Sequence, residues 1–275
     1  MRVHLNNRSL LLITGSDSES FLQAQLSNDI SKLTESSIQL NAYCQHQGKI
    51  IGLFWVMRYM NGFLISFPND LLEKIQSRLK MFVIMSDVVI EDLSNDLFQI
   101  GLIGEQKSDA YALNDSLSML VTDSLDQSRD DFQDIKEWDK SCFDSLLPEI
   151  FLDTSGKLVP QMLNLDIDEV GVNFSKGCYP GQEVVARLHY LGSAKRRLFS
   201  FVSDSDLQLG DSLYCASSEG ASLRGSRYKG SGIVVTKVKY NSLFYCLATL
   251  DVDLIDKEIT LNSEHGPKLK RINNE

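Results

Sequence analysis

Residues 176–183 read Lys176-Gly-Cys-Tyr-Pro-Gly-Gln-Glu183. Proline suits the first position of a helix and an acid suits its first turn, so the pattern predicts a helix from near Pro180 to about Tyr190. Cys178 then lies just ahead of a helix N-terminus, where the helix dipole and the Lys176 ammonium favour the thiolate. The pattern therefore indicates a reactive thiol. The alternative is that Cys178 is a small buried hydrophobic residue at a loop–helix junction.

Two other stretches accompany these eight residues. Pro160-Gln-Met-Leu-Asn-Leu165 precedes them, and a segment near the N-terminus runs from Ile13-Thr-Gly-Ser-Asp to Leu-Ser-Asn-Asp29. Together the three stretches resemble the motifs of the YgfZ-type folate-binding proteins. That family is related to the glycine-cleavage T-protein, an aminomethyltransferase. The resemblance covers roughly residues 5–60 and 145–250.

The resemblance implies an α+β, three-module T-protein-like fold. Residues 1–48 and 145–195 would form a discontinuous folate-binding domain. Residues 49–144 would form a ferredoxin-like α+β domain, and residues 196–275 a C-terminal small antiparallel β-barrel domain.

Residue patterns agree with this division. In the middle of the chain, an amphipathic helix is expected at 70–82, with strands at 50–58, 62–67, 83–91 and 97–103. After Arg197 the pattern changes to short alternating segments separated by glycines, which is typical of a small antiparallel barrel. The barrel strands are expected at 197–203, 211–216, 223–228, 231–239 and 244–250.

The resemblance places a folate pocket in the N-terminal module. Bacterial members carry tryptophans at two places associated with that pocket. One place falls on Trp138 and the other on Arg8, a departure whose guanidinium can stack on a ring or bind a carboxylate. Gln161 and Asn164 would read the edge of the pteridine. Two alternatives stay open. Trp138 could be a core aromatic residue, and the side chains of Gln161 and Asn164 could instead form hydrogen bonds with backbone groups.

The resemblance gives two roles to residues 176–187, which we call the signature segment. Cys178 would be the functional thiol, and Tyr179 and Arg187 would contribute to folate binding.

The chain lacks an acid that aminomethyltransferases have. In those enzymes an acidic residue follows the Gln-Gly turn after the second strand and handles the folate nitrogen. Here the stretch from Gln47 to Leu53 contains no Asp or Glu. Because a general base must lie within reach of its proton, the sequence argues against aminomethyl transfer and leaves other enzymatic activity open.

Composition limits the compartments, metal sites and partners that this chain can have. Five scattered cysteines without a Cys-x-x-Cys motif predict a reduced, cytoplasmic protein without a disulfide framework, and no metal site is expected. The longest apolar run is too short to span a membrane. A net charge of -10 argues against direct tRNA binding. The basic segment 176–197 suits an anionic small molecule, an acidic protein surface or a short stretch of RNA phosphate, or it is a solvated helix face.

Two functions follow from the resemblance. The leading one is a tetrahydrofolate-binding accessory factor that supports assembly or repair of iron–sulfur clusters in client enzymes, including those that modify tRNA. Its partners would be folate and iron–sulfur client or assembly proteins. The alternative is a folate-dependent one-carbon transferase that acts on an unidentified substrate, with Cys178 as nucleophile.

Overall fold

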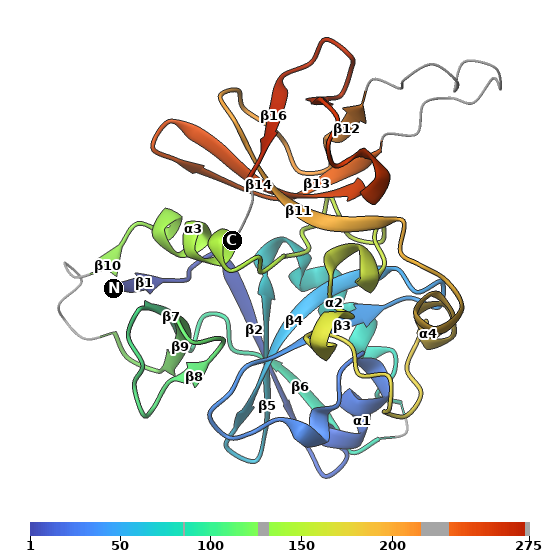
Figure 1. The fold of residues 1–275 in the computed structure, drawn as a ribbon. Coiled ribbons are helices and arrows are strands. Elements are labelled where there is room, and N and C mark those ends of the chain that lie inside the picture. The colour runs from blue at the N-terminus through green and yellow to red at the C-terminus, as the bar shows by residue number, and fades with distance from the viewer. Residues whose placement is uncertain (85, 126–131, 216–230, 273–275) are drawn as a thin grey trace.

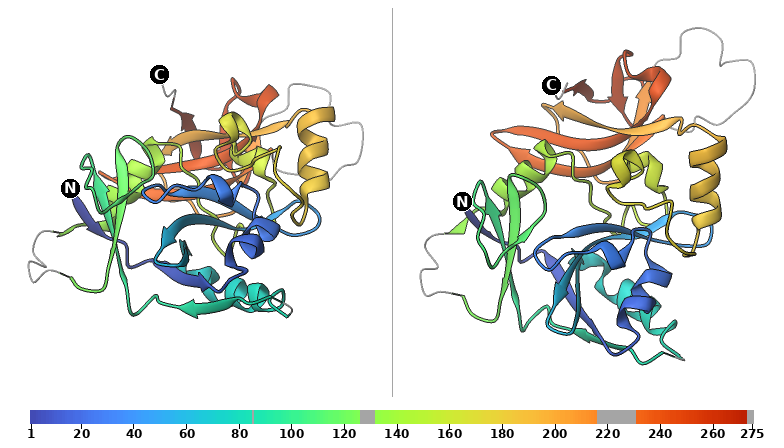
Figure 2. Two further views of the ribbon diagram at one scale, coloured as in Figure 1. Left: turned by 90° about the horizontal axis from the view of Figure 1, so that it is seen from below. Right: turned by 60° about the horizontal axis from the view of Figure 1, so that its bottom comes forward.

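The structure, a computed structural model, describes residues 1–84, 86–125, 132–215 and 231–272. Over these residues the strands form two open sheets and one closed barrel (Figure 1). The barrel lies on one side of the molecule and the open sheets on the other, with helix α3 packed between them (Figures 1 and 2). The mixture of helices and mainly antiparallel strands confirms the predicted α+β class.

The first open sheet has the strand order β3-β4-β5-β2-β6, and all its pairings are antiparallel. Its strands are β2 (Arg8–Thr14), β3 (Gln39–Cys44), β4 (Ile50–Tyr59), β5 (Gly62–Pro68) and β6 (Val89–Asp92). The helical segments around it are α1 (Ser18–Gln25), η1 (Ile30–Lys32), η2 (Asn69–Leu71) and α2 (Leu72–Lys80). Every residue of the central strand β5 is buried, so both faces of the sheet are covered at this strand. The β3–β4 hairpin crosses the expected domain boundary between residues 48 and 49.

One predicted strand is shorter than expected. The sequence predicted a strand over 83–91, but pairing begins only at β6. Ile84 is 85% exposed, so the apolar residues that suggested an earlier start do not face a core. The predicted helix at 70–82 is present as η2 followed by α2.

The second open sheet has the order β10-β1-β7-β9-β8. Its strands are β1 (Arg2–His4), β7 (Phe98–Ile103), β8 (Tyr111–Ala112), β9 (Leu117–Thr122) and β10 (Phe132–Gln133). Helix α3 (Ile135–Asp144) contacts β1 and β7 on one side and the barrel on the other. The strands predicted for the middle of the chain therefore belong to two different sheets.

The C-terminal strands close into a barrel in the order β11-β14-β13-β12-β15-β16, which confirms the predicted barrel. The strands are β11 (Arg196–Ser203), β12 (Ser212–Cys215), β13 (Gly232–Tyr240), β14 (Leu243–Asp251), β15 (Ile259–Leu261) and β16 (Lys268–Arg271), with η7 (Val252–Leu254) after β14. The barrel has its own core, which includes Phe201, Leu213 and Cys246. The strand expected at 223–228 lies outside the described residues.

The segment between α3 and the barrel contains little regular structure. Its elements are η4 (Pro160–Leu163), η5 (Ile167–Glu169) and α4 (Gln182–Leu191). Val185 is the one residue of α4 that is buried, so this helix presents most of its surface to solvent. Within the described ranges, no helix is long and apolar enough to cross a membrane.

Candidate functional site

A cavity of about 250 Å³ lies where β2, α3 and the barrel strand β13 meet, and we call it the α3 cavity. Its walls come from the first open sheet, α3, the segment after α3 and the barrel. The lining residues are Asn7, Arg8, Pro68, Trp138, Asp139, Cys142, Phe143, Leu147, Glu149, Phe151, Leu209, Thr236, Lys237 and Val238. Two of the residues singled out from sequence, Trp138 and Arg8, therefore line one cavity although 130 positions separate them in the chain.

Trp138 forms a rigid wall of this cavity. It is 2% exposed, and its ring meets the ring of Trp55 edge to face with 6.0 Å between centroids. On the other side the ring lies against Gly101 of β7, where a Cβ atom would come within 2.3 Å of Trp138 Cε3. The ring position is thus fixed by close packing, and the lack of a side chain at Gly101 makes room for it.

Arg8 is held in place by its own contacts. Its guanidinium stacks on Trp55 at 3.6 Å from the ring centroid. Nη1 donates to Glu149 Oε1 at 2.5 Å, and Nε donates to Ser66 Oγ at 2.8 Å. A guanidinium that is stacked and paired in this way keeps its orientation, so Arg8 supplies a fixed cation beside the cavity.

Two carboxyl groups of the α3 cavity were not singled out from the sequence. Burial raises the pKa of Asp139 to about 6, and the nearby Glu149 carboxylate adds to this shift. Burial also raises the pKa of Glu149, against the opposing effect of Arg8. Asp139 follows Trp138 directly, and Glu149 is the next acid after α3. Their closeness in sequence to Trp138 was the available signal.

The signature segment lies elsewhere, at the loop before α4. Cys178 is exposed, whereas the other four cysteines are buried. Helix α4 begins at Gln182, two residues later than predicted, with Gly181 as its N-cap at φ 83°. A Cβ on Gly181 would come within 2.5 Å of the Gln45 carbonyl oxygen, so a glycine is required where this loop meets the β3–β4 turn.

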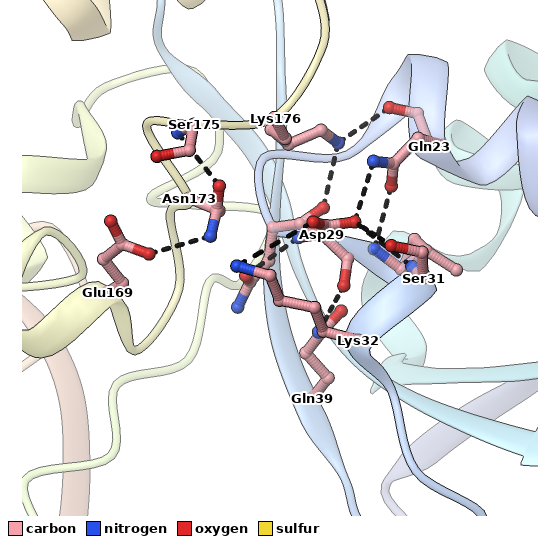
Figure 3. A network of polar contacts seen from close by, with 11 residues as sticks. Gln23, Asp29, Ser31, Lys32, Gln39, Glu169, Asn173, Ser175 and Lys176 are labelled. Carbon is pink, nitrogen blue, oxygen red and sulfur yellow. Dashed lines mark hydrogen bonds and ion pairs between the residues drawn. The ribbon is translucent and has the colours of Figure 1, made fainter.

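Lys176 joins the signature segment to the N-terminal motif. Its side chain is buried, and its ammonium donates to the carbonyl oxygens of Gln23, Leu26 and Asn28 at 2.7, 2.5 and 2.9 Å. Figure 3 shows the contact between Lys176 and Gln23. Gln23 and Leu26 lie at the C-terminal end of α1, where helix carbonyls lack internal partners and favour a cation. The lysine that the sequence suggested as a neighbour of the thiol instead caps α1.

Further contacts run along the same seam. The Asn28 side chain donates to the Val170 carbonyl, the Asn173 backbone N–H donates to the Ser27 carbonyl, and Ser27 Oγ donates to the Gly171 carbonyl. The two parts of the sequence that carry the family motifs thus meet in space.

The remaining predicted folate residues do not line the α3 cavity. Gln161 Nε2 donates to the Val185 carbonyl, and Asn164 Nδ2 donates to the Leu198 carbonyl, so the two amides fasten η4 to α4 and to β11. Arg187 is exposed and pairs with Glu183 at 2.8 Å. The assignment of these three residues to folate stays a prediction.

Tyr179 is buried beside Lys176, whose ammonium lies 5.4 Å from the ring centroid. Burial raises the pKa of its hydroxyl. Its assignment to folate likewise stays a prediction. In the part of the chain that the structure describes, no three His, Cys, Asp or Glu side chains are placed to hold a metal ion together.

Comparison with known proteins gives related chains and a related fold. The chain is 32% identical over 228 residues to the tRNA-modifying protein YgfZ of Colwellia psychrerythraea, covering 72% of this chain and 70% of that protein. It is 29% identical over 251 residues to the tRNA-modifying protein YgfZ of Klebsiella pneumoniae. An uncharacterised protein of Haemophilus influenzae is 26% identical over 273 residues and aligns with 95% of the chain. No family model matches.

Among solved structures, the glycine cleavage system aminomethyltransferase T from Bartonella henselae superposes with a TM-score of 0.72. The alignment covers 99% of this chain and 84% of that protein, at 10% sequence identity. This similarity confirms the predicted T-protein-like fold.

Proposed function

The chain belongs to the family of the tRNA-modifying protein YgfZ, and from this premise we propose that it is a folate-related factor in tRNA modification. In finer terms, it binds tetrahydrofolate in the α3 cavity and supports assembly or repair of iron–sulfur clusters in client enzymes, with Cys178 as the functional thiol. The related solved structure, an aminomethyltransferase of the glycine cleavage system, agrees in fold with a folate-related role.

The observation that carries the folate part is the meeting of Trp138 and Arg8 at one cavity. A folate pocket needs aromatic or apolar walls, a few polar groups and a fixed cation. Trp138, Phe143 and Phe151 supply the aromatic wall, and Arg8 supplies the cation. The residues present therefore fit the ring system of a folate.

The thiol part of the proposal rests on the exposure of Cys178. An exposed thiol on a short loop can reach a metal or thiol of a partner protein, whereas the four buried cysteines cannot. Burial raises the pKa of three of them, Cys44, Cys142 and Cys246, well above the ordinary range of a thiol, so they remain protonated.

The role of the thiol is tested by measuring cluster-dependent tRNA thiolation in cells that lack their own YgfZ and express this chain. We expect Cys178→Ser to accumulate as folded protein and to fail to restore thiolation. Cys215→Ser, at a buried barrel position, serves as the matched control and should restore it. Full restoration by Cys178→Ser would remove the thiol from the proposal and leave the folate part standing.

A one-carbon transferase is the second candidate, and Asp139 favours it. A carboxyl group with a pKa of about 6 can exchange a proton near neutral pH. Asp139 could therefore act as the acid or base that the stretch after Gly48 lacks, since that stretch contains no Asp or Glu up to Leu53. Incubation with methylene-tetrahydrofolate and small amines or thiols tests this function. Turnover that disappears in Asp139→Asn would establish it, and absence of turnover with the wild-type chain would reject it.

A further inference from the structure

Residues 176–181, which we call the thiol loop, place one exposed pair between buried anchors. Lys176 is 8% exposed and Tyr179 is 7% exposed, and Gly181 is buried as well. Cys178 and the glycine before it, which lie between the first two anchors, are exposed. The backbone on both sides of the thiol is therefore held by packing, while Cys178 itself stays accessible.

The first anchor is the Lys176 ammonium. It donates to the carbonyl oxygens of Gln23, Leu26 and Asn28, and Figure 3 shows its side chain directed toward Gln23. A lysine ammonium has three N–H groups, so these bonds use all of them. Because no N–H remains to bind a thiolate, Lys176 holds the loop in place and provides no hydrogen bond to Cys178.

The second anchor is Gly181, the N-cap of α4, which has φ 83°. A Cβ atom there would come within 2.5 Å of the Gln45 carbonyl oxygen and within 2.7 Å of Gly48 Cα. Glycine at this position therefore lets the loop lie directly on the β3–β4 turn. Next to it, the Gln182 N–H donates to the Tyr179 carbonyl at 3.1 Å, which joins the loop to the helix.

The two anchors bind separate parts of the N-terminal region. Lys176 contacts the end of α1 and the Asn28 carbonyl, whereas Gly181 contacts the β3–β4 turn. Six residues that are fixed at both ends have few accessible conformations, so the position of Cys178 relative to these elements is restricted. A reactive group that is already in place reacts faster than one that must first be ordered.

We propose that Lys176 and Gly181 are positioning residues, which fix the thiol loop so that it presents Cys178 to a partner protein from one place. This inference rests on the thiol role proposed above and adds the residues that hold the thiol. The role of Lys176 then differs from the one that its position in the sequence suggested, since its ammonium positions the thiol and does not activate it.

Two variants release one anchor each. Lys176→Met removes three hydrogen bonds, whereas Gly181→Ala adds a methyl group that collides with the Gln45 carbonyl oxygen and leaves the lysine in place. Leu213→Ala is the control, because it removes packing inside the barrel core, where Leu213 is fully buried, and does not touch the loop. Circular dichroism and urea unfolding show that each variant is folded and how much stability it has lost.

The first measurement is tRNA thiolation in cells that lack their own YgfZ and express each variant, compared at equal amounts of folded protein. We expect Lys176→Met and Gly181→Ala to restore thiolation roughly tenfold less well than the wild type, because a displacement of about 1 Å at a reacting group can slow a reaction about 100-fold. Leu213→Ala should restore thiolation as the wild type does.

The second measurement separates positioning from activation. Iodoacetamide reacts with the thiolate, and mass spectrometry follows its rate at Cys178 from about pH 6 to pH 10. Positioning predicts that the wild type and Lys176→Met share the midpoint of this pH profile, because a small reagent reaches an exposed thiol in any orientation of the loop. Activation by the ammonium predicts a midpoint at higher pH in Lys176→Met, with Gly181→Ala like the wild type.

Four results would overturn the inference. If both loop variants restore thiolation fully and Cys178→Ser does not, the thiol works without a fixed loop and the proposed function survives. A midpoint at higher pH in Lys176→Met alone would make the ammonium an activating group. An equal loss of thiolation in Leu213→Ala would assign the loss to stability.

The fourth result concerns the proposed function itself. Full restoration of thiolation by Cys178→Ser would reject the role of the thiol, and this inference with it. If Lys176→Met does not accumulate as folded protein, Gly181→Ala decides the outcome by itself, because it changes only the other anchor of the same loop.

Discussion

Lys176→Met tests whether the signature lysine acts as the cap of α1. Methionine keeps the length of the side chain and removes the ammonium. Three carbonyl oxygens, on Gln23, Leu26 and Asn28, then lose their donor. A buried acceptor left without a partner costs about 1–3 kcal/mol, so the three together cost about 3–9 kcal/mol.

An opposing effect reduces this loss. Burial lowers the pKa of Lys176 from 10.5 to about 8, with the Asp29 carboxylate acting in the other direction. At 1.36 kcal/mol per pKa unit, the buried charge destabilises the fold by about 3 kcal/mol, and methionine removes that cost. The cost of losing three hydrogen bonds, about 3–9 kcal/mol, exceeds the gain of about 3 kcal/mol except at its lower limit. We therefore expect Lys176→Met to be about 2–3 kcal/mol less stable than the wild type at pH 7.

The assay is urea-induced unfolding at pH 7, with Lys32→Met as the matched control. The Lys32 side chain is 62% exposed and lies 3.9 Å from the same Asp29, so its loss should change the free energy of unfolding by less than about 0.5 kcal/mol. Equal stability of the two variants would refute the capping role.

The pH dependence gives an independent check. Between pH 8 and 10.5 the unfolded chain holds a proton on Lys176 that the folded chain has released, so the wild type gains stability as the pH rises through this window. The methionine variant has no such group. The stability difference between wild type and Lys176→Met should therefore widen from pH 8 to 10, and a constant difference would contradict the burial argument.

Three other outcomes are expected. Leu146 adopts φ 54° at the C-terminal end of α3, where its N–H donates to the Phe143 carbonyl and the next N–H donates to the Cys142 carbonyl. Leu146→Gly should therefore raise the free energy of unfolding by about 0.5 kcal/mol in urea titrations. A lower free energy of unfolding would show that the leucine side chain contributes stabilising contacts. Gly101→Ala should lower stability by about 2–3 kcal/mol in thermal unfolding, because the new methyl group collides with Trp138; unchanged stability would mean that the ring can move. The pKa of Asp139 in the folded chain is about 6, above its ordinary value of 3.8, so its contribution to stability falls as the pH rises from 4 to 6. Asp139→Asn should be about 1 kcal/mol more stable than the wild type at pH 7 and equal to it near pH 4, and equal stability at pH 7 would indicate a solvated carboxylate.

Local signals in the sequence predicted much of the fold. Glycines after Arg197 indicated the barrel, and apolar residues at helical spacing, such as Ile75 and Leu79, indicated α2. The distribution of strands between sheets was not predictable in this way. Pairing of β1 with β7 and of β2 with β6 joins residues far apart in the chain, and no local pattern specifies such partners.

The candidate site was predicted in part for the same reason. The motifs led to Trp138, Arg8 and Cys178, and the structure places the first two at one cavity and the third on the surface. Lys176 stands two positions from Cys178, yet its ammonium binds carbonyls about 150 positions earlier in the chain. Closeness in sequence does not fix the direction of a side chain in a loop. Asp139 could not be predicted because its place in the cavity wall is a property of the folded chain.

A tetrahydrofolate titration followed by tryptophan fluorescence tests the central claim most directly. The chain contains two tryptophans, and both lie at this site, since Trp138 lines the α3 cavity and Trp55 contacts it. Free tryptophan amide at the same absorbance corrects for light absorbed by the ligand. Binding at the α3 cavity predicts saturable quenching with a Kd in the micromolar range. Unchanged fluorescence up to millimolar tetrahydrofolate would contradict folate binding at the α3 cavity.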